Sequence, residues 1–161
     1  CPGSCSASLL DGPPVTLSAA PAPGYRFDSW SEASCATTGT VCMVTADADR
    51  TGTATFQPLE TLTVTVATLG VGAGSVTITP QGQAQTTCAV GTCTRIIDQG
   101  SSVTLSVTNS ADTRFNGWTG DCATFGTATT CTILMDRPRT AGVAFESYNL
   151  QLSIARPAGA G

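Results

Sequence analysis

Hydrophobic and polar residues alternate along most of this chain, in short runs. Residues 62–66 read Leu-Thr-Val-Thr-Val, and residues 75–79 read Ser-Val-Thr-Ile-Thr. A period of two places successive side chains on opposite faces of a strand, so such runs predict strands with one buried face. Glycine, proline, asparagine and aspartate separate the runs, and no segment keeps a helical period over ten residues. The pattern predicts an all-β fold of small antiparallel β-sandwich-like units.

This pattern occurs twice along the chain. Residues 12–42 and residues 100–131 share a Val-Thr-Leu run, an Arg-Phe pair followed by tryptophan, and two cysteines. Self-similarity of this kind is the signature of tandem repeats. We therefore expect residues 1–58 to form repeat one, residues 59–147 to form repeat two, and residues 148–161 to be the first strand of a third repeat or a strand donated to another copy.

Residues 60–87 have no counterpart at the front of repeat one. Their two alternating runs flank a turn with three glycines at positions 70, 72 and 74, which predicts a hairpin. The same pattern starts again at residue 148. A sheet that lacks a hairpin has an unpaired edge, so either the sequence is a window on a longer array or the ends of different copies complete each other. The candidate strand-exchange residues are Tyr148, Leu150, Leu152 and Ile154.

Eight cysteines lie in polar loops, four in each repeat. Zinc binding by four thiolates is one interpretation, but only the first cysteine pair of each repeat has the spacing of a zinc knuckle. Disulfides that each close a short loop are the favoured interpretation, and they are typical of secreted proteins. Short-range pairing gives Cys1–Cys5, Cys35–Cys42, Cys88–Cys93 and Cys122–Cys131, although sequence alone allows other connectivities.

The chain has few charged residues, and they are of few types. The net charge is −4, the seven positive charges are all arginine, and the chain has neither lysine nor histidine. Scattered arginines argue against nucleic acid as a partner. Without histidine and lysine there is no Ser-His or Cys-His pair and no Schiff base, so we expect no enzyme and no cofactor. No run approaches the roughly 18 apolar residues of a membrane helix, so membrane insertion is not expected.

Two further sets of side chains are candidates for binding or catalysis. Trp30 and Trp118 occupy matching positions and could stack on sugar rings, with Tyr25 beside the first, but a single tryptophan in each small unit favours a core role. Asp112 and Asp121 could work as an acid–base pair on a glycoside, but aspartates in tight turns more often cap their own backbone. We therefore expect Tyr25 at the surface and the aspartates to be turn residues.

The longest motif is shared with a known family. The run Phe-Asn-Gly-Trp-Thr-Gly-Asp-Cys at residues 115–122, the Cys-Thr-Ile-Leu-Met-Asp run at residues 131–136 and the run Thr-Ala-Gly-Val-Ala-Phe at residues 140–145 resemble the divergent internalin-type B-repeat of bacterial surface and secreted proteins. Repeat one is less close, since Ser29 replaces the glycine before the tryptophan. The resemblance implies spacers, stalks or adhesive modules, and it carries no catalytic residues to this chain.

These observations lead to one expected function and one alternative. We expect a non-enzymatic structural repeat of a bacterial surface or secreted protein, located outside the cell as a stalk, adhesin or head-to-tail filament building block. Its expected partners are neighbouring repeats or further copies of itself, with surface glycans as an additional candidate. The alternative is a carbohydrate-binding module attached to a secreted hydrolase.

Overall fold

The computed structural model describes residues 12–35 and 39–148. The chain divides into two compact units, Cys1–Leu59 and Glu60–Gly161, which are considered separately below. The long strand β4 (Ala54–Leu69) contributes its first residues to unit one and the rest to unit two. No helix within the described ranges is long and apolar enough to cross a membrane.

Unit one consists of two strand pairs. β1 (Pro14–Ser18) pairs antiparallel with β3 (Val41–Thr45), and β2 (Tyr25–Trp30) pairs antiparallel with the start of β4. A short 3-10 helix, η1 (Ala33–Cys35), follows β2. Among the described residues of this unit, the buried hydrophobic cluster is small. It consists of Cys35, Cys42 and Val44, with Leu17 and Trp30 packed against it.

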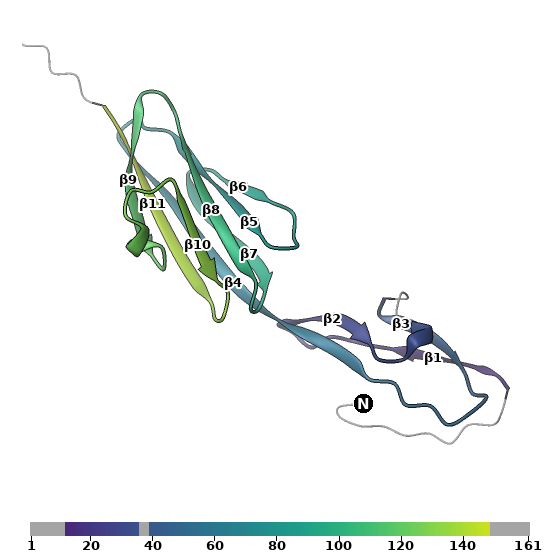
Figure 1. The fold of residues 1–161 in the computed structure, drawn as a ribbon. Helices are drawn as coiled ribbons and strands as arrows, with labels where there is room; N and C mark the ends of the chain where they lie inside the picture. The colour runs from purple at the N-terminus through teal and green to yellow at the C-terminus, as the bar shows by residue number, and fades with distance from the viewer. Residues whose placement is uncertain (1–11, 36–38, 149–161) are drawn as a thin grey trace, which may run out of the picture. The chain divides into compact units, whose positions relative to one another are not determined.

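Unit two is a sandwich of two sheets (Figure 1). One sheet has the order β10-β8-β5-β6, and in the other β4 lies between β11 and β7, while β9 pairs with β11. A second 3-10 helix, η2 (Ala123–Phe125), follows β9. The strand bounds are β5 (Gly74–Pro80), β6 (Thr86–Cys88), β7 (Gly91–Asp98), β8 (Ser102–Asn109), β9 (Thr113–Gly120), β10 (Thr130–Leu134) and β11 (Arg139–Ser147).

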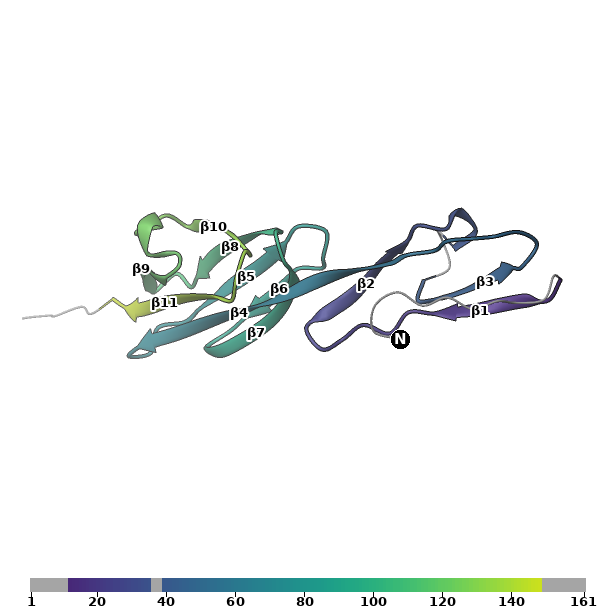
Figure 2. The same cartoon turned by 90° about the horizontal axis from the view of Figure 1, so that it is seen from below.

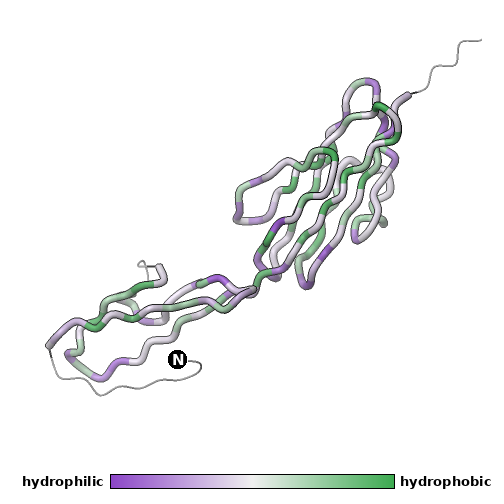
Figure 3. Tube along the Cα trace, turned by 180° about the vertical axis from the view of Figure 1, so that it is seen from behind, coloured by the Kyte–Doolittle hydropathy of each residue, from purple (hydrophilic) through white to green (hydrophobic). Residues whose placement is uncertain are grey.

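The core of unit two follows the alternation in the sequence. Leu62, Val64 and Val66 on β4 are at most 2% exposed, and Val76 and Ile78 on β5 are fully buried. The hydrophobic stretches lie along the strands of this unit in Figure 3. Full burial of one such side chain contributes about 1.5–3 kcal/mol. The prediction of all-β, sandwich-like units with disulfides is confirmed.

The predicted hairpin around the three glycines is wrong. β4 pairs with β11 and β7, whereas β5 pairs with β6 and β8 in the other sheet. The glycine turn therefore carries the chain from one sheet to the other. Gly74 is needed there because a Cβ atom at this position would lie 2.5 Å from the Phe145 ring. A period of two fixes which face of a strand is buried, but it does not say whether consecutive strands pair or face each other.

The sheet that contains β4 and β11 is not purely antiparallel. β11 runs parallel to residues 62–69 of β4 and antiparallel to β9. Figure 2 shows β4 between β11 and β7. Because β11 is the last strand of its repeat and β4 the first, the parallel pair closes the repeat by joining its beginning to its end.

Candidate functional site

Three disulfides close short loops in the described residues. Cys35–Cys42 lies in unit one, and Cys88–Cys93 and Cys122–Cys131 lie in unit two, with sequence separations of 7, 5 and 9 residues. These are the short-range pairs that the sequence favoured. Cys1 and Cys5 lie outside the described residues. Within the described part of the chain, all cysteines are bonded and no group of three or more potential metal ligands gathers.

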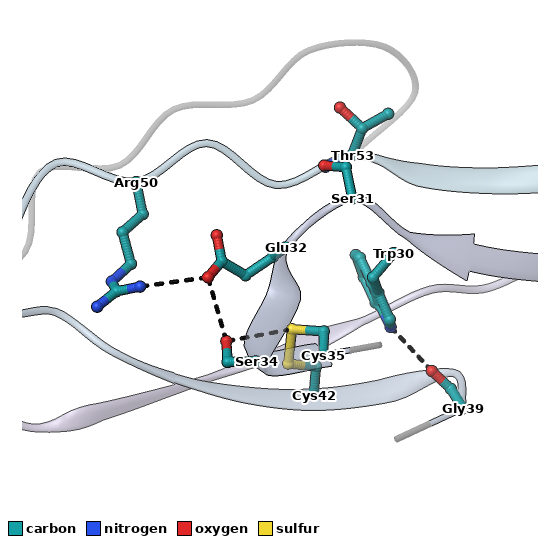
Figure 4. The surroundings of a disulfide bond; sticks show 9 residues. All are labelled: Trp30, Ser31, Glu32, Ser34, Cys35, Gly39, Cys42, Arg50 and Thr53. Atoms are coloured by element: carbon teal, nitrogen blue, oxygen red, sulfur yellow. Dashed lines mark hydrogen bonds and ion pairs between the residues drawn. A yellow bond between two sulfur atoms is a disulfide. The ribbon is translucent and has the colours of Figure 1, made fainter. Parts of the chain in front are cut away.

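In both units, the loop that a disulfide closes also accepts a hydrogen bond from the tryptophan that precedes it in the sequence. In unit two, Trp118 Nε1 donates a hydrogen bond to the Ala128 carbonyl at 2.7 Å, inside the loop that Cys122 and Cys131 close. In unit one, Trp30 Nε1 donates to the Gly39 carbonyl at 2.8 Å, inside the loop of Cys35 and Cys42 (Figure 4). The indole N–H thus fixes a loop carbonyl in both repeats.

Trp118 does not offer an open ring face to a sugar. Trp118 is 5% exposed, and its ring meets Phe115 edge-on at 5.6 Å, so its faces are in the core. Trp30 is half-buried and packs against Phe27 at 5.6 Å. The stacking role considered for Trp118 is therefore wrong, because stacking requires an accessible face. Tyr25 is 47% exposed.

An arginine–carboxylate cluster joins the end of β9 to the start of β11 in unit two. Arg139 Nη1 contacts Asp121 Oδ1 at 2.6 Å, Arg139 Nη2 contacts Asp136 Oδ1 at 2.7 Å, and Nε donates to the Leu134 carbonyl at 3.0 Å. Asp121 Oδ2 accepts the Thr140 backbone N–H at 2.8 Å. This hydrogen bond, followed by Arg139, holds the pKa of Asp121 below its usual value despite opposing desolvation. We call Asp121, Asp136 and Arg139 the arginine clamp of unit two.

Unit one contains an equivalent clamp made with a different carboxylate. Arg50 contacts Asp47 Oδ1 at 2.6 Å and Glu32 Oε1 at 3.2 Å (Figure 4). Nearby, the backbone N–H of Thr53, the counterpart of Gly142, donates to Ser31 Oγ at 2.8 Å. Glu32 therefore makes the contact to arginine that Asp121 makes in unit two. Hydrogen bonding to Arg50 lowers the pKa of Asp47.

The clamps explain the aspartates that sequence reasoning assigned to turns. Asp121 lies at the end of β9 and Asp112 just before its start, so the proposed acid–base pair does not form. The signal that could have revealed the clamps is an aspartate followed three positions later by arginine, present at Asp47–Arg50 and again at Asp136–Arg139. The third residue of each clamp, Glu32 or Asp121, could not be predicted in this way, because these two carboxylates do not align between the repeats.

Both repeats have a second exposed ion pair, with the same arginine but a different carboxylate. In unit two, Glu146 Oε2 accepts from Arg114 Nη2 at 2.7 Å and from Asn116 Nδ2 at 3.1 Å, and these contacts lower the pKa of Glu146. In unit one, Arg26 lies 3.5 Å from Asp28, the counterpart of Asn116. The carboxylate lies on the strand next to the arginine in unit two and on the same strand as the arginine in unit one.

The candidate strand-exchange segment is described only at its start. Tyr148 is 65% exposed, and its backbone N–H donates to the Asp112 carbonyl at 3.2 Å. Leu150, Leu152 and Ile154 lie outside the described residues.

The fold and these loops define an all-β tandem-repeat protein whose units are closed by disulfides and arginine clamps. The family follows from the sequence match: the divergent InlB B-repeat domain matches residues 2–60 and 74–149. The chain belongs to this family, and the resemblance inferred from its motifs is confirmed with two tandem units.

Other comparisons add little to this assignment. A solved bacterial adhesin from Mobiluncus mulieris, which contains intramolecular disulfide, isopeptide and ester bond cross-links, is similar at 15% sequence identity with a TM-score of 0.35. The match covers 69% of this chain and 44% of the adhesin chain, so this chain spans less than half of that structure. No curated protein sequence matches.

Proposed function

We propose that this chain is a non-enzymatic structural segment, a stalk or spacer, of a bacterial protein located outside the cell. Membership of the B-repeat family supports this role, and so do the disulfides, which persist in oxidising compartments. The observation that carries the proposal is that both units use the same three devices: a disulfide and an indole hydrogen bond that hold one loop, and an arginine clamp beside that loop. These devices resist local opening of the chain.

The carbohydrate-binding alternative has less support. It needs aromatic faces that a sugar can reach, and Trp118 is buried with its N–H already bonded. Tyr25 alone is a small platform. We therefore do not propose a glycan as the ligand of this chain.

Location is tested on intact cells that produce the protein. Protease added outside the cells should remove an epitope within residues 60–148 while a cytosolic marker survives. Survival of the epitope on intact cells, with loss only after lysis, would contradict an external stalk. This test does not depend on whether copies of the chain associate.

A further inference from the structure

The two methionines of the chain lie in opposite environments. Met43, on β3, is 63% exposed, whereas Met135, which follows β10, is fully buried in the core of unit two. Met135 is also fixed through its backbone, because its N–H donates to the Ser101 carbonyl at 2.9 Å and its carbonyl accepts from the Gly100 N–H at 2.8 Å. A small reagent in solution therefore reaches the side chain of Met43 but not that of Met135.

The exposure of Met43 follows from its position in the strand. It lies between two buried residues of β3 and faces outward. Its counterpart in unit two, Thr132, also lies between two buried residues of its strand, β10, and is also exposed. The four strands of the sheet that contains β10 are all among the described residues. An outward side chain at this position is thus a property of the fold.

The residue opposite this position carries a hydroxyl group in both units. In unit two, Thr132 pairs with Thr104, and their Oγ1 atoms share a hydrogen bond at 3.2 Å. In unit one, Thr16 pairs with Met43 in the corresponding register and is itself exposed. A thioether is only a weak hydrogen-bond acceptor. The Thr16 hydroxyl therefore lies opposite a weak acceptor at the place where unit two has a strong one.

We propose that Met43 is a site of oxidation by peroxides and that its sulfoxide is accepted by the fold. The sulfur lone pair attacks one oxygen of hydrogen peroxide and the O–O bond breaks. The transferred oxygen gives its proton to the departing hydroxide, which leaves as water. The sulfur is oxidised by two electrons, the peroxide is reduced, and the thioether becomes a polar sulfoxide.

The sulfoxide supplies the acceptor that the methionine lacks. Directly opposed residues of an antiparallel pair have Cβ atoms about 4.5–5.5 Å apart, so the new oxygen can accept from the Thr16 hydroxyl. Oxidation thus converts the pair of Thr16 and Met43 into a hydrogen-bonded pair like that of Thr104 and Thr132. This property goes beyond the proposed stalk role and does not depend on it.

Met135 shows where the fold does not accept the same change. Its sulfoxide would place a polar oxygen inside the apolar cluster of unit two. Burying a polar group without a hydrogen-bond partner is unfavourable. Oxidation of Met135 therefore requires unit two to open, and its rate follows that opening.

The first test compares the two methionines in one sample of the folded chain. The protein is treated with hydrogen peroxide, quenched at intervals, reduced and digested with trypsin. Cleavage after arginine, except before proline, places Met43 in residues 27–50 and Met135 in residues 115–139, so mass spectrometry measures them separately. Met43 should be oxidised at least about tenfold faster than Met135, and denaturation in urea should remove the difference.

The second test asks whether Thr16 accommodates the sulfoxide. Hydrogen exchange is measured at residues 14–18 and 41–45 before and after peroxide treatment that oxidises Met43 alone. Thr16→Val removes the donor, and Thr104→Val is the matched control, because it removes the equivalent hydroxyl in unit two. Exchange should be unchanged by oxidation in the wild type and in Thr104→Val, and faster after oxidation in Thr16→Val.

Two results would overturn the proposal. One is equal oxidation of the two methionines in the folded chain. The other is an increase in exchange on oxidation of the wild type as large as that in Thr16→Val, since the hydroxyl would then have no part in accepting the sulfoxide. Both results would leave the proposed stalk role intact.

Discussion

The two tryptophans hold their loops by the same hydrogen bond, but their neighbours are buried to different extents. Phe145, whose ring packs against Phe115, is 0% exposed, whereas its counterpart Phe56, which packs against Phe27, is half-buried. Because the cost of removing a side chain depends on how completely it is packed, these matched phenylalanines allow a direct comparison.

Phe145→Ala should lower the free energy of unfolding of unit two by about 3–5 kcal/mol, since a fully buried ring leaves a cavity. Phe56→Ala should cost less, because its site is partly solvated already. Denaturant unfolding of each variant, followed by tryptophan fluorescence, measures both changes. Equal losses in the two variants would contradict the difference in burial.

Acid should weaken the clamp of unit two. The Thr140 N–H and Arg139 hold the pKa of Asp121 below that of an unfolded aspartate, near 3.9. Stability from this group is therefore fully present above about pH 4 and is lost as the pH falls through the lower, folded-state pKa. Melting temperatures between pH 7 and pH 2 should fall more steeply for the wild type than for Asp121→Asn. Parallel curves would show that Asp121 does not contribute.

At the scale of the elements, the alternation in the sequence predicted the strands and their buried faces, but not how the strands pair. Residues 62–66 and 75–79 are strands as expected, yet they lie in opposite sheets and not in one hairpin. The parallel pair of β4 and β11 joins segments more than 70 residues apart, and no local pattern encodes it. The clamps could have been found only by comparing the two repeats.

The loop after β9 should depend on its disulfide. Replacing both Cys122 and Cys131 by alanine removes a cross-link across 9 residues, which the chain-entropy estimate values at about 2–3 kcal/mol. Limited proteolysis should then cut between residues 123 and 130, where the wild type resists. The Trp118 hydrogen bond remains in this variant, so cleavage equal to that of the wild type would mean that the indole alone holds the loop.

At the scale of the whole molecule, the described residues of the two units form buried clusters of different size. The buried cluster of unit two draws on both sheets, while that of unit one contains Cys35, Cys42 and Val44. Buried apolar area is the dominant stabilising term, so we expect unit one to unfold first.

Calorimetry should therefore show two transitions. Phe56→Ala should lower the first and leave the second in place, and Phe145→Ala should lower the second. A single transition that both variants shift equally would contradict separate units.

An extracellular repeat, as proposed above, should have its loops closed by disulfides in the native protein. The most direct measurement is the mass of the native protein, taken from the cells that make it, after alkylation without reduction and again after reduction. The account predicts that no cysteine is alkylated in the first sample and that all eight are alkylated in the second. Cysteines alkylated before reduction, above all at Cys88, Cys93, Cys122 and Cys131, would contradict it.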